Sequence, residues 1–335
     1  MSIGETAEPY FVRDRINLSS ADLGAIVLST TNDFFGAVDR MLQDIPAHFE
    51  PGLYDDAGKY MDGWESTRRR YGGYDHAVIQ LAVPGVVRGF DIDTSFFTGN
   101  FAPACSVEAC YTTATPNDST AWTKILDISP LGASAHHFLA CQSDKVWSHL
   151  RLNIFPDGGV ARFRTYGEPS LDRAIQSHPT IDLASALNGG RVVGFSDAHF
   201  GNSHRILLPG APKNMGDGWD TRRRRIPGHE WIVVALGRIG HIEEILIDTA
   251  FHKGNYPEFV SVQAAALDPG MHGLPFAVLN SAMFWQELLA QSPLSADAVH
   301  RFSDLADIGP ATHVRVNIYP DGGISRLKVF GRIGG

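Results

Sequence analysis

The sequence predicts an all-β protein built as two tandem, similar antiparallel β-sandwich domains. Two observations lead to this prediction. The chain contains a long internal repeat, and its apolar segments are short and separated by turns rich in glycine and proline. With 335 residues, the chain is long enough for two domains of ordinary size, each able to bury a core of its own.

A block of nine residues appears twice in the chain. Residues 62–70 (DGWESTRRR) recur as residues 217–225 (DGWDTRRRR), 155 positions later. A second block, residues 151–159 (RLNIFPDGG), recurs as residues 315–323 (RVNIYPDGG) at an offset of 164, so the second repeat holds nine extra residues between the blocks. A period this long is typical of duplicated domains and not of a solenoid.

The matching segments define two predicted domains. The first repeat spans residues 20–166 and the second spans residues 188–332. Short apolar runs predict strands in both repeats; they are residues 77–83, 90–92, 231–236 and 245–247. The best candidates for helices are residues 34–42 and 283–290.

Each predicted domain closes with an alternating segment followed by a turn. Apolar and polar residues alternate over 150–154 and 314–319, as in a strand whose successive side chains point to opposite faces. Pro-Asp-Gly-Gly follows in both repeats, and the chain then resumes as residues 160–166 and 324–330. We therefore expect each domain to end in a β-hairpin.

The repeated nine-residue block lies in a polar loop and holds groups that suit acid–base chemistry and anion binding. Two carboxylates can divide the roles of general acid and base, and a guanidinium pairs with a carboxylate through two hydrogen bonds. We predict that the catalytic residues are Asp62, Glu65, Asp217 and Asp220. We predict that substrate is bound by Trp64, Arg68, Arg69, Arg70, Trp219, Arg223, Arg224 and Arg225. The structural alternative is a loop anchored by its tryptophan, with the arginines as a solvated face.

Two further pairs of polar residues match between the repeats. Asp93 and Asp248 follow apolar strands, and His149 and His313 lie on the polar face of the alternating segments. We add these four to the predicted substrate-binding residues, with strand capping and an ordinary structural histidine as the alternatives. The turns with Gly-Asn at 99–100 and 254–255 suit a glycine with positive φ.

Composition excludes several classes of partner. The net charge of −9 argues against a nucleic-acid backbone or an anionic membrane, since both need a broad positive field. Three cysteines do not make a disulfide framework or a zinc motif. The first residues carry no signal peptide, and no segment is apolar enough to span a bilayer, so we expect a cytoplasmic protein.

The chain also lacks the motifs of several enzyme classes. It has no phosphate loop, no dinucleotide-binding fingerprint and no Gly-x-Ser-x-Gly, so chemistry with ATP, NAD or a serine nucleophile is not indicated. Its histidines do not fall into a spacing that defines a metal site. The sequence shows no cofactor motif. It does not decide whether a divalent metal activates the attacking water.

The order of these motifs resembles that of the allantoicase family. The resemblance covers residues 20–332 and rests on the duplicated DGW(E/D)(S/T)xRR, DTxFxxGN and RxNIxPDGG segments. It implies two tandem jelly-roll-like β-sandwiches and a hydrolase that converts allantoate to ureidoglycolate and urea in allantoin degradation. It also implies a homo-oligomer.

The sequence leaves open the choice between related functions and the choice of the active repeat. The alternative functions are a non-catalytic tandem module that binds sugars, and a related ureido-hydrolase that acts on or releases ureidoglycolate. The repeats differ at His76 and Trp231, and at Phe97-Thr98 and His252-Lys253, so the sequence does not say which copy works.

Overall fold

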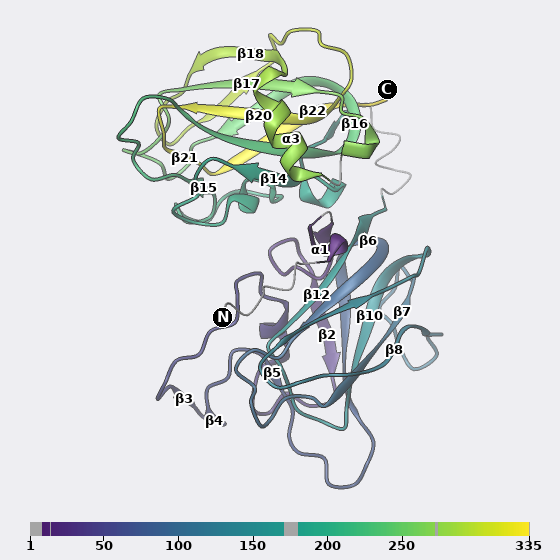
Figure 1. Cartoon of the computed structure of the whole chain (residues 1–335). Coiled ribbons are helices and arrows are strands. Elements are labelled where there is room, and N and C mark those ends of the chain that lie inside the picture. Colours follow the sequence, from purple (N-terminus) through teal and green to yellow (C-terminus); the bar gives the residue numbers. More distant parts are fainter. Residues whose placement is uncertain (1–8, 14, 171–179, 272–273, 335) are drawn as a thin grey trace, which may run out of the picture. The chain divides into compact units, whose positions relative to one another are not determined.

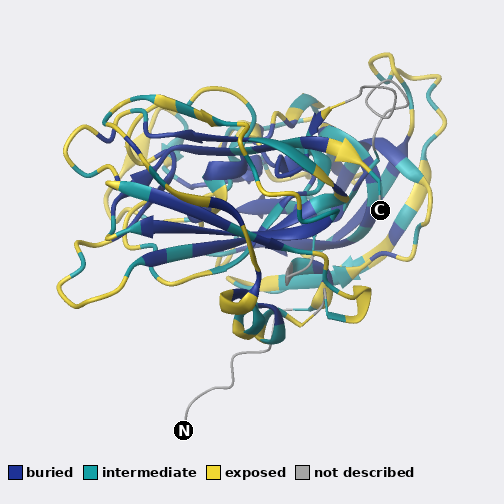
Figure 2. Cartoon of the chain, turned by 90° about the horizontal axis from the view of Figure 1, so that it is seen from above, coloured by how far each residue is buried: buried dark blue, intermediate teal, exposed yellow. Residues whose placement is uncertain are grey.

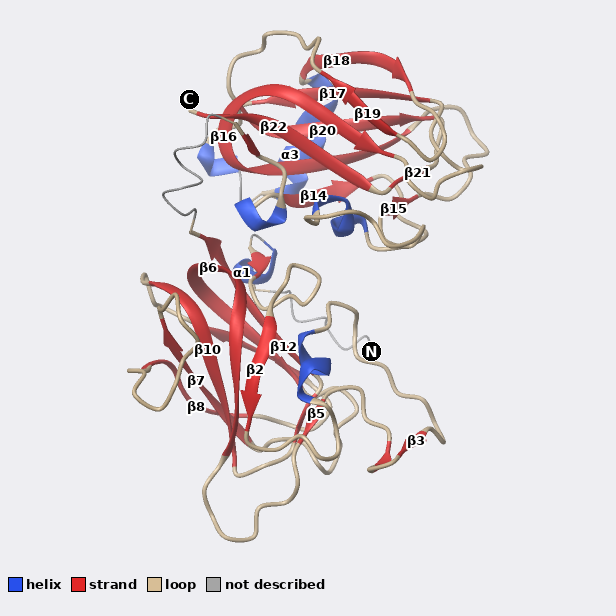
Figure 3. Cartoon of the chain, turned by 180° about the vertical axis from the view of Figure 1, so that it is seen from behind, coloured by secondary structure: helices blue, strands red, loops and turns tan. Residues whose placement is uncertain are grey.

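The computed structural model describes residues 9–13, 15–170, 180–271 and 274–334 (Figure 1). The chain divides into two compact units, Met1–Ser170 and Leu171–Gly335. The predicted all-β class and the two tandem sandwiches are confirmed, since each unit holds an eight-stranded antiparallel sheet and helices are few and short among the described residues (Figure 3).

The described part of the first unit contains twelve strands, some of them only two residues long. They are β1 (Ile16–Asn17), β2 (Ile26–Thr30), β3 (Tyr54–Asp55), β4 (Gly58–Lys59), β5 (Trp64–Glu65), β6 (Asp75–Asp93), β7 (Ala104–Cys110), β8 (Thr123–Pro130), β9 (His136–Ala140), β10 (Val146–Phe155), β11 (Gly159–Val160) and β12 (Arg162–Pro169). Its described helical turns are α1 (Tyr10–Arg13) and the 3₁₀ turn η1 (Val38–Leu42).

The second unit repeats this order. Its strands are β13 (Ile181–Asp182), β14 (Arg191–Phe195), β15 (Trp219–Asp220), β16 (Glu230–Asp248), β17 (Phe259–Ala265), β18 (Gln286–Pro293), β19 (Val299–Phe302), β20 (Ala311–Tyr319), β21 (Gly323–Ile324) and β22 (Arg326–Ile333). Its described helical turns are η2 (Ala186–Asn188), η3 (Ser203–Leu207), η4 (Pro269–Met271), α3 (Pro275–Ser281) and η5 (Ala282–Phe284).

A single long strand organises each unit. In the first unit the strand order is β1-β12-β6-β10-β7-β8, and β2 and β9 also pair with β6. The first half of β6 pairs with β10 and β2, whereas its second half pairs with β12 and β9. The strand therefore takes part in both layers of the sandwich. Buried residues concentrate along the strands and exposed residues in the loops (Figure 2).

Two predictions about connections and strands need correction. The expected terminal hairpins do not form, because β10 and β12 each pair with β6 and not with one another. The Pro-Asp-Gly-Gly turn instead carries the chain from one layer to the other. The runs 77–83 and 90–92 are likewise parts of one strand, Asp75–Asp93, and the second unit has the equivalent strand Glu230–Asp248.

The two predicted helices are also wrong. Within 34–42, only Val38–Leu42 is helical, as a 3₁₀ turn. Within 283–290, the turn Ala282–Phe284 is followed directly by the strand Gln286–Pro293. A short apolar run such as Leu288-Leu289-Ala290 has no period that separates helix from strand.

The extra residues of the second repeat fall mainly in one loop. The segment between β17 and β18 spans residues 266–285, whereas the segment between β7 and β8 spans only 111–122. The longer segment holds η4, α3 and η5. The inserted residues thus build helical structure that the first unit lacks at this position.

Candidate active site

The first acid of the motif forms a buried ion pair in both repeats. Asp62 Oδ2 lies 2.6 Å from Nη2 of Arg162, and Asp217 Oδ2 lies 2.8 Å from Nη2 of Arg326. Burial alone would raise the pKa of Asp62 and Asp217, but hydrogen bonds from the arginines and from backbone N–H groups hold both below the usual range. Each arginine also donates to backbone carbonyls of the surrounding loops. This arrangement favours a structural role for both aspartates.

The motif tryptophans anchor the loop. Trp64 and Trp219 have no exposed surface. Their indole nitrogens donate to the backbone oxygens of Asn32 (2.8 Å) and Asp197 (2.7 Å). The two tryptophans were predicted to bind substrate, with anchoring of the loop as the structural alternative. Their complete burial favours anchoring over direct contact with a substrate.

The second acid of the motif has the opposite electrostatic setting. Burial raises the pKa of Glu65, and it raises the pKa of Asp220 to about 6. Each carboxylate accepts one hydrogen bond from an asparagine side chain, Asn100 (2.8 Å) or Asn255 (2.9 Å). Each repeat therefore holds one carboxyl with a lowered pKa and one with a raised pKa, three residues apart.

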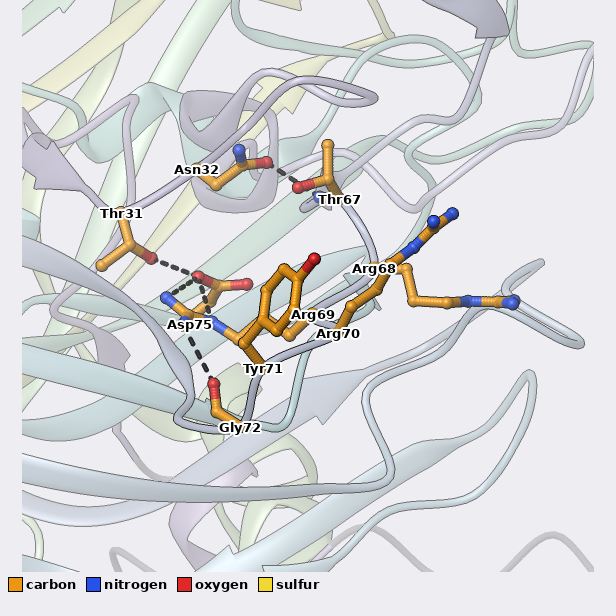
Figure 4. A pocket seen from close by; sticks show the side chains of 9 residues that line it. All are labelled: Thr31, Asn32, Thr67, Arg68, Arg69, Arg70, Tyr71, Gly72 and Asp75. Atoms are coloured by element: carbon orange, nitrogen blue, oxygen red, sulfur yellow. Dashed lines mark hydrogen bonds and ion pairs between the residues drawn. The ribbon is translucent and has the colours of Figure 1, made fainter.

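The arginine loop lines an open pocket of about 300 Å³ in the first unit (Figure 4). Arg69 pairs with the buried Asp75 through Nε (3.0 Å) and Nη2 (2.9 Å), and Thr31 donates to the same carboxylate oxygen. Arg68 and Arg70 extend away from Asp75 (Figure 4). The two exposed guanidiniums are therefore the groups of this loop that are available to an anion.

The second unit builds its arginine loop in the same way. Arg224 Nη1 lies 2.6 Å from Oε1 of the buried Glu230, and Ser196 donates to the other oxygen of that carboxylate. The aspartates of the two Pro-Asp-Gly-Gly turns, Asp157 and Asp321, accept from the backbone N–H of Arg69 (2.6 Å) and Arg224 (2.7 Å). Arg223 and Arg225 are exposed. Within each unit, the Pro-Asp-Gly-Gly turn therefore holds the arginine loop in place through this hydrogen bond.

Asp93 and Asp248 shape the turns that follow the long strands. Asp93 accepts from the backbone N–H of Ser95 (2.7 Å), and Asp248 accepts from that of Ala250 (2.8 Å). Positive φ was expected at Gly99 and Gly254. It occurs instead at Phe96 (69°) and Phe251 (67°). Both aspartates are buried, which favours the capping alternative.

His149 and His313 are buried on the sheet and lie apart from the arginine loop. Each ring Nδ1 lies 2.9 Å from the hydroxyl oxygen of the preceding residue, Ser148 or Thr312. His149 pairs with Gln80 in the register, whereas Asp75 pairs with Ile154, five positions along the strand. Five residues of strand span roughly 17 Å, so the structure does not bring His149 to the arginine loop.

Sequence reasoning missed a polar cluster on the outer face of each sheet. In the first unit, Arg151 pairs with Glu108 (2.6 Å from Nη2 to Oε2), and Asn153 donates to the same oxygen (3.0 Å). The side chain of Trp122 lies under the Arg151 guanidinium at 4.9 Å. The available signal was the spacing of arginine and asparagine in the repeated RxN segment, which puts both side chains on one face of a strand.

The described residues hold neither a metal-binding cluster nor a membrane-spanning helix. Among those residues, no three histidine, cysteine, aspartate or glutamate side chains are grouped so that they could hold a metal ion. None of the described helices is long and apolar enough to cross a bilayer.

Known proteins resemble this chain over nearly its whole length. The family model described as Allantoicase repeat matches it twice, at residues 16–170 and 181–334. The chain is 55% identical over 327 residues to a probable allantoicase of Rhizobium meliloti, covering 97% of this chain and 96% of the relative. It is 50% identical over 321 residues to a probable allantoicase of Stutzerimonas stutzeri, covering 95% of this chain and 96% of the relative.

A solved structure agrees with these relatives. The crystal structure of allantoicase from Saccharomyces cerevisiae matches with a TM-score of 0.79 at 31% sequence identity, covering 95% of this chain and 93% of that chain. The duplicated family match coincides with the two structural units. On this evidence, the chain belongs to the allantoicase family.

Proposed function

We propose that this protein is an allantoicase, a hydrolase that cleaves a C–N bond of allantoate to give ureidoglycolate and urea. The observation that carries the proposal is the double match to the allantoicase repeat, one match in each unit. The identity of 55% to a probable allantoicase over 97% of the chain supports it.

The reaction sets requirements that the described side chains meet. Allantoate carries one carboxylate, which an arginine recognises through its planar fork, and two ureido arms. Departure of urea needs a proton, and the attacking water must lose one. Of the four acids predicted to be catalytic, Glu65 and Asp220 have raised pKa values and suit proton donation better than Asp62 and Asp217. Their catalytic role stays a prediction.

The assay uses the purified full chain and allantoate, with urea, ureidoglycolate and ammonia measured separately. We expect one urea per allantoate, without ammonia and without added ATP or NAD. Release of ammonia would assign the protein to another class of amide hydrolase. Urea release from ureidoglycolate but not from allantoate would assign it to the related ureido-hydrolases. Repeating the assay after dialysis against a chelator decides whether a metal activates the water.

The assembly and the compartment are part of the same proposal. We expect a homo-oligomer, as the family resemblance implies, and a protein that works in the cytoplasm. Light scattering on the purified protein measures the native mass, and a mass equal to that of the single chain would contradict the oligomer.

A further inference from the structure

The outer faces of the two sheets differ in the residue that lies opposite one buried arginine. In the first unit, the Arg151 guanidinium is neutralised by Glu108, which contacts both Nε (2.8 Å) and Nη2 (2.6 Å). The residue equivalent to Glu108 in the second repeat is Gln263, at the same offset of 155 as the motif block. Register confirms the equivalence, since Arg151 pairs with Glu108 and Arg315 pairs with Gln263.

Arg315 therefore lacks the carboxylate that its counterpart has. Among the described residues, its hydrogen bond is from Nε to Oδ1 of Asn317 (2.9 Å), and no carboxylate lies within ion-pair distance. Only 8% of Arg315 is exposed. A buried cation without a counter-ion costs several kcal/mol in general, and a bound anion would offset that cost.

The groups around Arg315 are neutral or aromatic. Its guanidinium lies 5.0 Å from the ring of Trp231. The imidazole of His229 lies 3.3 Å from Asn317 Oδ1, and burial followed by the charges of Arg315 and Arg224 lowers the pKa of His229, which keeps the ring neutral at pH 7. None of these neighbours cancels the positive charge.

The insertion of the second repeat covers this face. Val278 and Ala282, from α3 and η5, pack with Trp285 on Val233, which is paired with Arg315 across the sheet. Figure 1 shows α3 lying along the second sheet. Gln263 Nε2 donates to the backbone oxygen of Trp285 (3.1 Å). The residue that replaces Glu108 therefore also holds the inserted helical segment against the sheet. A cover lowers the local dielectric and strengthens a charge pair formed beneath it.

We propose that Arg315 binds the carboxylate of the substrate on the outer face of the second sheet, and that the working site therefore lies in the second repeat. This inference rests on the proposed function for the identity of the anion. A guanidinium fork suits a carboxylate, and Trp231 holds one face of that fork. Arg151 cannot serve in the same way, because Glu108 already occupies its fork.

The decisive variant copies the first repeat into the second. Gln263→Glu places a carboxylate beside Arg315 and should close the ion pair seen between Arg151 and Glu108. We expect a folded protein whose KM for allantoate rises by roughly 10- to 100-fold, the range for loss of a charge-assisted hydrogen bond. The matched control, Glu108→Gln in the first repeat, frees Arg151 on a sheet without the helical cover, and should leave kcat and KM unchanged.

A second variant and a binding measurement keep the test independent of Gln263. Arg315→Met keeps an unbranched stem but removes the charge, and should raise KM at least as much. Glyoxylate, which has the carboxylate without the ureido arms, should raise the melting temperature of the wild type but not that of Arg315→Met. If both variants fold and keep the wild-type KM, the inference is wrong even though the enzyme works. If the wild type leaves allantoate intact but glyoxylate stabilises it through Arg315, the anion site stands and the proposed substrate fails.

Discussion

At the residue scale, both repeats contain the same buried aspartate–arginine pair. Arg162 has no exposed surface, and it depends on Asp62 for its only negative charge among the described residues. Replacing one member of a buried ion pair leaves the other as an unpaired buried charge, which typically costs about 3–5 kcal/mol. We expect Asp62→Asn to lower the free energy of unfolding by that amount in a denaturant titration.

The control for this variant is Asp118→Asn, at an exposed position. Surface changes of this kind usually stay within about 0.5 kcal/mol. If Asp62→Asn is as stable as the control but loses one limb of the pH–rate profile, the residue has the predicted acid–base role. If it is as stable as the control and its pH–rate profile is unchanged, neither role applies.

His252 offers a test in the opposite direction. It has no exposed surface, and neither ring nitrogen has a well-formed hydrogen bond among the described residues. Burial lowers the pKa of the imidazole, although the nearby Asn255 side chain favours the charged form. The first repeat has Phe97 at this position, also fully buried. Because an unsatisfied buried polar group costs about 1–3 kcal/mol, His252→Phe should stabilise the protein by about 1 kcal/mol. The mirror variant Phe97→His should destabilise it, and a loss of stability in His252→Phe would show that the imidazole has a partner of its own.

Asp220 predicts a pH dependence of stability. Burial raises its pKa from 3.8 to about 6, so the folded state resists ionisation of this carboxyl. Its contribution to stability is therefore complete below about pH 4 and is lost as the pH rises towards 6. Asp220→Asn should remove this loss, and its unfolding free energy should exceed that of the wild type at pH 7 but not at pH 4. Parallel stability curves for the two proteins would contradict the assignment.

The sequence located the polar motif but not the partners of its side chains. Two copies of an acid–tryptophan–acid–arginine block were enough to predict a shared role. The ion pair of Asp62 with Arg162 joins residues one hundred positions apart, and nothing in the motif itself points to that contact. An alignment of the repeats shows that Gln263 replaces Glu108. Only the strand register shows that this exchange removes the carboxylate opposite Arg315.

At the scale of elements, alternation identified strands well and connections poorly. Residues 150–154 and 314–319 lie in β10 and β20 as predicted. Turn chemistry specifies that the chain reverses, but not whether the next strand joins the same layer, so the hairpin was the wrong choice between two turns of similar composition. The apolar runs 77–83 and 90–92 give no sign that Pro84 and the residues after it continue the same strand. The register shift between β6 and β12 lies in this middle region.

The crossing of the long strand with the last strand leaves no room for a side chain. A Cβ added to Gly331 in β22 would lie 2.2 Å from the backbone oxygen of His241, and one added to Gly167 would lie 2.4 Å from that of Val86. Gly331→Ala must therefore push β16 and β22 apart, and overpacking of this kind costs about 1–3 kcal/mol. Gly254→Ala, where no atom lies within 4 Å of the added Cβ, should leave the unfolding midpoint in urea unchanged. Equal stability of the two variants would mean that the strands separate at no cost.

At the scale of the whole molecule, duplication preserved the scaffold and exchanged one acid, Glu108, for an amide, Gln263. Both units keep the buried aspartate–arginine pair, the anchored tryptophan and the paired arginine loop. Only the second combines an arginine without a carboxylate partner, among the described residues, with a helical cover. The repeat made two domains predictable from the sequence, whereas the difference between them required the register of the strands.

Separate cores predict separate unfolding. Each unit buries its own set of apolar side chains, so destabilising one repeat should lower one transition in calorimetry and leave the other in place. We expect Asp62→Asn to shift the transition of the first unit and Gly331→Ala that of the second. Since Arg315 lies in the second unit, the loss of allantoate hydrolysis on heating should follow the transition that Gly331→Ala lowers. A single transition that both variants lower equally would show that the repeats unfold together, and activity that follows the other transition would place the working site in the first repeat.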